Sequence, residues 1–125
     1  LDYAIGRFRL LPHQPCDNLF LLDHIARESL KEQDGGWTWK FDPNLWAKLA
    51  YSRRDPAEML AKMACPVAFF RGADTSLVTD EIWEFMKLAF PAAPFAAIPE
   101  AKHHLILDQP LAVVAALETL FASVG

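Results

Sequence analysis

Two short apolar runs separated by a helix-length stretch place the strongest constraint on how this chain folds. Residues 65–70, Cys-Pro-Val-Ala-Phe-Phe, are apolar at every position, which is typical of a strand covered on both faces. Residues 94–98, Pro-Phe-Ala-Ala-Ile, form a second such run. Two strands joined through a helix pair in parallel by a right-handed crossover. The expected fold class is therefore α/β, with a strand-helix-strand-helix unit and parallel strands.

N-cap residues and apolar spacing predict the helices that flank these strands. Thr79 followed by two acidic residues begins a helix, because a hydroxyl caps the first turn and acids favour its dipole. Asp108 before Gln109-Pro110 is expected to cap a last helix. The apolar stripe of the first helix is expected at Ile82, Phe85, Met86, Ala89 and Phe90. The inward side of the last helix is expected at Leu111, Val114, Leu117, Leu120 and Phe121.

The first part of the chain has a different pattern, in which helices are joined by aromatic-rich loops. A helix is expected from Asn18 to about Lys31, with the paired glycines at 35–36 lying in the loop that ends it. Asp-Pro pairs at 42–43 and 55–56 predict two more helix starts, because Asp caps and Pro fits the first turn.

Charge and composition exclude several classes of partner. Twelve basic and sixteen acidic residues give a net charge of −4 without a basic stripe, so we expect no nucleic-acid partner. No apolar run approaches the roughly 20 residues that span a bilayer, and no signal peptide is visible. Two distant cysteines are expected to be reduced, as in a cytoplasmic protein. No spacing suggests zinc, and we expect no cofactor.

The loops that follow the two expected strands carry the residues suited to chemistry. Asp74 lies in the loop after the first strand, and His103 lies in the loop after the second. In an open α/β sheet, ligands bind at this carboxyl edge of the strands. A carboxylate there can accept the Nδ1–H of an imidazole, which fixes its tautomer, and a histidine is suited to general base work near neutral pH.

Three segments resemble the carboxyl-terminal part of an α/β-hydrolase: Arg71-Gly72-Ala73-Asp74, Ala101-Lys102-His103-His104 and Asp108-Gln109-Pro110. In that family the chain order is nucleophile, acid, histidine. The resemblance implies that residues 56–125 form the last two strands and helices of the core. It also implies that residues 1–55 are the end of a helical cap (lid) inserted before them.

The resemblance implies roles for single residues. His103 fits the catalytic histidine, which follows a small residue and one further residue, and His104 is its neighbour. Lys102 stands where the family usually has glycine. Asp74 fits the acid, although the commonest spacing would place that acid at Thr75. A carboxylate after an earlier strand and Asp80 within this chain are the alternatives.

The nucleophile has no counterpart in this sequence. A G-x-S-x-G elbow needs glycines on both sides of the serine, and none of the five glycines has that context. We therefore expect a piece of a hydrolase that acts on an ester, amide or similar small substrate and is inactive alone. A missing amino-terminal half or a self-association partner is expected to complete the sheet, because two parallel strands do not make a sheet that stands alone.

Two other interpretations remain open. The upstream nucleophile would be Asp in an epoxide hydrolase or a haloalkane dehalogenase, and the same histidine would serve there. The chain would instead be a non-catalytic α/β interaction domain if its half-sheet pairs with a partner chain. A metal site at His103, His104 and Asp108 is disfavoured, because the side chains of adjacent histidines point in different directions.

Overall fold

The computed structural model describes residues 1–42, 44–48 and 62–124, which fall into two compact units. One unit contains residues 1–9 and 19–65, and the other contains residues 10–18 and 66–125. The helix start expected at 55–56, and the expected boundary between lid and core at the same place, lie outside the described residues.

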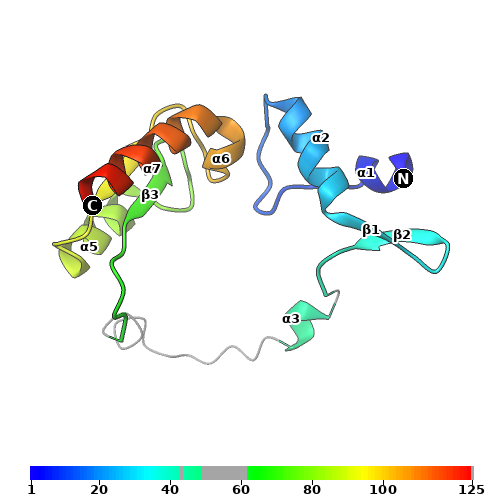
Figure 1. Cartoon of the computed structure of the whole chain (residues 1–125), viewed down its shortest axis with the longest axis horizontal. Helices are drawn as coiled ribbons and strands as arrows, with labels where there is room; N and C mark the ends of the chain where they lie inside the picture. Colours follow the sequence, from blue (N-terminus) through cyan, green and yellow to red (C-terminus); the bar gives the residue numbers. More distant parts are fainter. Residues whose placement is uncertain (43, 49–61, 125) are drawn as a thin grey trace. The chain divides into compact units, whose positions relative to one another are not determined.

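The second unit is built on a pair of parallel strands. Its elements are β3 (Phe69–Gly72), α5 (Asp80–Ala89), β4 (Phe95–Ile98), α6 (Leu105–Asp108) and α7 (Pro110–Val124) (Figure 1). β3 and β4 are neighbours, with Phe69 opposite Phe95 and Gly72 opposite Ile98. The expected α/β class and the parallel pairing are therefore confirmed.

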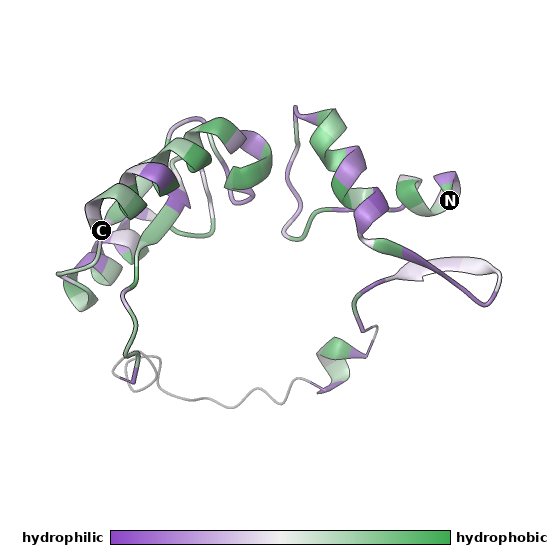
Figure 2. Cartoon of the chain, viewed as in Figure 1, coloured by the Kyte–Doolittle hydropathy of each residue, from purple (hydrophilic) through white to green (hydrophobic). Residues whose placement is uncertain are grey.

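The core of this unit lies between β4 and α7. Ile98, Ala101 and Val113 are buried there, and Phe70 and Leu117 pack against them. The prediction for α7 was wrong in part. Three of the expected inward residues are largely exposed, namely Leu111, Val114 and Phe121. Nearly every turn of α7 is apolar (Figure 2), so periodicity alone does not define which face is buried.

Helix α5 begins as expected but buries a different face. The Thr79 hydroxyl accepts the N–H of Ile82 over 3.3 Å, which confirms the predicted N-cap. The buried residue is Trp83, whose ring meets that of Phe95 edge-on with centroids 5.0 Å apart. The predicted stripe was wrong in part, because Met86 and Phe90 are half-buried but Ile82 and Phe85 are exposed. The large indole removes more apolar area from water than either of them and determines the orientation of the helix.

The first unit contains a β-hairpin that the sequence interpretation missed. Its elements are α1 (Asp2–Gly6), α2 (Leu19–Glu28), β1 (Leu30–Gln33), β2 (Gly36–Trp39) and α3 (Leu45–Lys48). β1 and β2 pair antiparallel, with Leu30 opposite Trp39. Helix α2, which was expected to end near Lys31, therefore ends at Glu28, because the residues from Leu30 onward form the hairpin.

The residues at the turn of this hairpin suit its backbone geometry. Asp34 and Gly35 have φ values of 54° and 74°, and a two-residue type I′ turn requires positive φ at both positions. Asp-Gly is a preferred pair for such a turn. Residues 34–37, expected as a simple loop, are thus the turn and the start of β2.

The helix expected to start at 42–43 is present as α3, whose first residue is Leu45, and position 43 lies outside the described residues. The Oδ1 atom of Asp42 accepts the N–H of Asn44 over 2.9 Å, just before α3 begins.

Among the described helices of both units, none has the length and apolar character needed to cross a bilayer.

Candidate active site

Backbone hydrogen bonds join the loops that follow β3 and β4. The N–H of Ala73 donates to the carbonyl oxygen of Ile98 over 2.8 Å, and the N–H of Asp74 donates to that of Ala101 over 2.9 Å. A Cβ atom at Gly72 would lie 2.6 Å from the carbonyl carbon of Ala101, and closer still to the carbonyl oxygens of Ala101 and Lys102. The two loops approach this closely because residue 72 has no side chain.

Arg71 anchors the far end of the first loop. Its guanidinium donates to the carbonyl oxygen of Val78 over 3.1 Å, pairs with the carboxylate of Asp80 and lies 5.0 Å from the centre of the Trp83 ring. The side chain is only 12% exposed. The sequence analysis named Arg71 only within the hydrolase-like segment and gave it no role, although a single cation at the end of an apolar strand was a visible signal. Arg71 thus links the loop that carries Asp74 to the start of α5.

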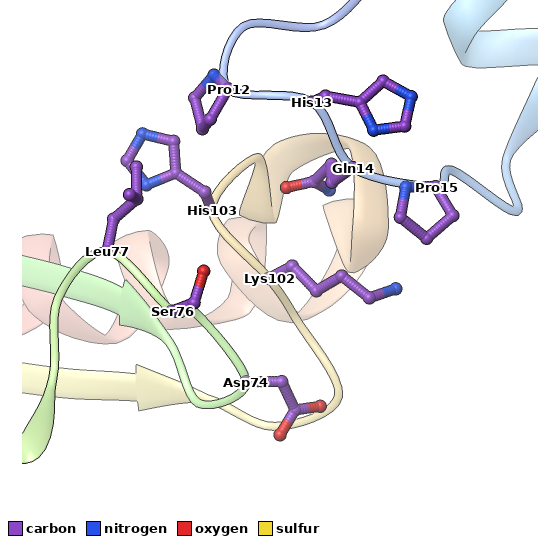
Figure 3. Close-up of a pocket in the computed structure, with 9 residues that line it drawn as sticks. All are labelled: Pro12, His13, Gln14, Pro15, Asp74, Ser76, Leu77, Lys102 and His103. Atoms are coloured by element: carbon purple, nitrogen blue, oxygen red, sulfur yellow. The ribbon is translucent and has the colours of Figure 1, made fainter.

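Both loops and the segment at residues 12–15 surround a pocket of about 180 Å³. Asp74, Ser76 and Leu77 line it from the first loop, and Lys102 and His103 line it from the second (Figure 3). The two residues singled out as acid and histidine therefore share one pocket at the carboxyl edge of neighbouring parallel strands.

Asp74 and His103 do not touch in this arrangement. Both side chains are exposed, and no hydrogen bond joins them among the described residues. Figure 3 shows the Asp74 carboxylate pointing away from the His103 ring. Their pairing as acid and imidazole stays a prediction, which requires the Asp74 side chain to turn toward the ring.

His104 has a different environment from His103. Its Nε2 lies 3.1 Å from the carbonyl oxygen of Pro12, and its backbone N–H donates to Oε1 of Gln14 over 3.0 Å. Because a carbonyl oxygen only accepts, Nε2 is the protonated nitrogen in this contact. The ring is half-buried and is not among the residues that line the pocket. Of these two adjacent histidines, His103 is thus the one that lines the pocket, and His104 contacts the segment at residues 12–14.

Asp108 was expected to be the N-cap of α7, but its side chain instead accepts hydrogen bonds from Lys102, in the loop after β4, and from Gln14. Asp108 is the last residue of α6, and its Oδ2 accepts the backbone N–H of Lys102 over 2.7 Å. Both of its carboxylate oxygens lie 3.0 Å from Nε2 of Gln14. Sequence reasoning missed Gln14 because no local motif marks it. In the described part of the chain, no three His, Cys, Asp or Glu side chains are grouped to hold a metal ion.

Comparison with known proteins supports the fold. No family model and no curated protein sequence matches the chain. The solved structure of E-2-(acetamidomethylene)succinate hydrolase superposes with a TM-score of 0.73, covering 97% of this chain and 43% of that one. The chain has part of an α/β-hydrolase fold. It spans less than half the length of that hydrolase, and the 21% sequence identity supports a shared fold rather than a shared substrate.

Proposed function

We propose that this sequence is the carboxyl-terminal part of an α/β-hydrolase that acts on an ester, amide or similar small substrate. In this proposal His103 is the general base and acid, and Asp74 is the acid that orients it. One observation carries the proposal. An aspartate and a histidine line the same pocket from loops that follow two neighbouring parallel strands, within part of an α/β-hydrolase fold.

The chemistry assigned to His103 follows from the imidazole. A neutral ring nitrogen takes the proton from the attacking group and later gives it to the leaving group. A carboxylate at the other nitrogen fixes the tautomer and stabilises the cation that forms. Both side chains are exposed, so Asp74 can rotate toward His103 without displacing a packed core.

The nucleophile in this proposal comes from outside the sequence. Ser76 lines the pocket, but it is flanked by Thr75 and Leu77 and lacks the glycines of a nucleophile elbow. An upstream segment of a longer chain or a partner chain would supply the attacking group. The 125-residue chain by itself is then expected to turn over no substrate.

The test uses the complete reading frame that encodes this sequence. The purified protein is treated with a fluorophosphonate probe and assayed with small esters and amides, including acetamido-substituted dicarboxylates suggested by the name of the similar hydrolase. We expect the probe to label a serine outside residues 1–125 and His103→Ala to abolish labelling. His13→Ala removes a second imidazole from the same pocket and should leave labelling intact.

Other results would favour the alternatives. Turnover without labelling, with oxygen from ¹⁸O-water entering an enzyme carboxylate, would indicate an Asp nucleophile. A complete protein that is neither labelled nor active, while the chain forms a stable dimer, would favour the interaction domain. Turnover that survives His103→Ala would overturn the role assigned to His103.

The role of Asp74 has its own test. In a Ser-His-Asp triad, replacing the acid by its amide lowers kcat by about 10⁴ because the wrong tautomer is stabilised. We expect Asp74→Asn to lower kcat by several orders of magnitude. Asp80→Asn changes an exposed carboxylate nearby and should leave kcat within a factor of about three. An unchanged Asp74→Asn variant would mean that another carboxylate is the acid.

A further inference from the structure

We propose that Gln14 and Asp108 are positioning residues that hold the backbone on both sides of His103. The N–H of Lys102 donates to Asp108 over 2.7 Å, and the N–H of His104 donates to Gln14 over 3.0 Å. The N–H of His104 belongs to the peptide group directly after His103, and the N–H of Lys102 belongs to the second peptide group before it. The proposal rests on the function proposed above for His103.

The peptide group between Ala101 and Lys102 is held at both of its polar atoms. Its carbonyl oxygen accepts the N–H of Asp74 over 2.9 Å, and its N–H donates to Asp108. A peptide group is planar, so fixing both atoms fixes its orientation. Because the N–H of His104 is also held, hydrogen bonds restrain the backbone on both the N-terminal and the C-terminal side of His103.

Gln14 completes this arrangement from a distant part of the sequence. Its Nε2 donates to both carboxylate oxygens of Asp108 over 3.0 Å, and its Oε1 accepts from His104. Along its segment, every second residue from Pro12 to Asn18 is half-buried, and the residues between them are exposed. The amide of Asn18 donates to the carbonyl oxygen of Leu107 over 2.7 Å, so the segment is attached to α6 at a second point.

The order of donors and acceptors makes the arrangement testable. Asp108 can only accept, so the amide group of Gln14 must turn its nitrogen toward Asp108 and its oxygen toward His104. In Asp108→Asn, the new amide nitrogen would face Gln14, and one N–H of the network would lose its acceptor. In Gln14→Glu, two carboxylates would face each other and repel.

Combining the two substitutions restores the network. In the double variant Gln14→Glu/Asp108→Asn, the carboxylate at position 14 accepts from His104 and from the new amide at position 108. The amide oxygen at position 108 still accepts from Lys102. The acceptors of Lys102 and His104, a hydrogen bond between positions 14 and 108 and the single negative charge of the wild-type network are all recovered, with the donor and acceptor between positions 14 and 108 exchanged.

The first measurement is backbone amide hydrogen exchange in the complete protein that contains this sequence. We expect exchange at Lys102 and His104 to rise by about tenfold in Gln14→Ala, Gln14→Glu and Asp108→Asn, as loss of one net hydrogen bond predicts. The double variant should return both amides to within about threefold of wild type. The amide of Trp83, bonded to Thr79 in α5 over 2.9 Å, is the internal control and should not change.

The second measurement separates positioning from folding. In the complete protein, the single variants should lower kcat with little change in KM, and the double variant should recover kcat. If the complete protein proves inactive, the proposed function fails, while the exchange data still decide whether the backbone is held. The arrangement would be overturned if the exchange rates of the Lys102 and His104 amides were unchanged in the single variants, or if they were as high in the double variant as in the single variants. The positioning role would be overturned if the double variant recovered the wild-type exchange rates but not the wild-type kcat.

Discussion

The backbone N–H of Asp74 donates a 2.9 Å hydrogen bond to the carbonyl oxygen of Ala101, which joins the loop after β3 directly to the loop after β4. The side chains of Asp74 and His103 point apart (Figure 3), yet their backbones are two parts of one hydrogen-bonded edge. A change that displaces one loop is therefore expected to displace the other.

Gly72→Ala tests this connection. The added methyl group would overlap the backbone of Ala101 and Lys102, so the loops must separate. Overpacking of this kind costs roughly 1–3 kcal/mol of folding free energy. We expect urea denaturation followed at Trp83, in the same unit, to show a loss in this range. Gly6→Ala is the matched control, because nothing lies within 4 Å of a Cβ there; an equal loss in both variants would contradict the steric explanation.

Arg71→Met removes the guanidinium while keeping an unbranched side chain of similar length. The carbonyl of Val78 loses its donor and Trp83 loses its cation, so we expect a loss of about 1–3 kcal/mol in the same denaturation experiment. Asp80→Asn removes only the partner that is 89% exposed and should cost less than about 1 kcal/mol. If Asp80→Asn costs as much as Arg71→Met, the ion pair rather than the carbonyl and ring contacts stabilises this loop.

Gly35→Ala should weaken the β1–β2 hairpin. The φ of 74° lies in the left-handed region, where a Cβ atom costs about 1–2 kcal/mol. Cross-strand NOEs between Leu30 and Trp39 should decrease in this variant. Gly36→Ala places its methyl group 3.8 Å from its nearest neighbour and should preserve these NOEs. Equal weakening by both substitutions would mean that β propensity, rather than the turn, sets hairpin stability.

The ion pair in α2 predicts a pH dependence. The hydrogen bond from Arg27, and then the charge of that residue, lower the pKa of Asp23 below its ordinary value. A carboxyl whose pKa is lowered by folding stabilises the helix above its unfolded pKa, and this contribution is lost as pH falls through the folded pKa. We expect the helical chemical shifts of α2 to decline only at that acidic end.

The control for this titration is Arg27→Gln. NMR should show the Asp23 carboxyl titrating at higher pH in this variant than in wild type. An identical titration curve in the two proteins would show that the pair exists without stabilising the charged carboxylate.

Local signals in the sequence predicted the features that local interactions determine. The apolar runs predicted the parallel strand pair, and the Thr79 and Asp42 N-caps predicted two helix starts. The hairpin was also encoded locally, in Asp34-Gly35, but the paired glycines were interpreted only as a helix stop. The sequence of α7 did not show which face is buried, because the helix carries apolar residues on all of its faces.

Only the site residues that follow the strand ends could be predicted from the sequence. Asp74 and His103 follow the two strands, and topology alone brings their loops to one edge. Gln14 is 94 residues from Asp108 and 90 from His104. No periodicity or spacing connects positions so far apart, and the extended segment that carries Gln14 resembles an ordinary loop in the sequence.

The same separation affects how the protein is made. Residues 10–18 leave the ribosome well before α6 exists, and must wait for it as an unpaired extended segment. Closing a loop of this length costs chain entropy before any contact compensates for it, and long-range closures slow folding. The hydrogen bonds of Gln14 to His104 and Asp108 therefore form only after residues 104–108 have been synthesised. Completion of the pocket thus depends on contacts between positions 90 or more residues apart, although Asp74 and His103 are only 29 residues apart in the sequence.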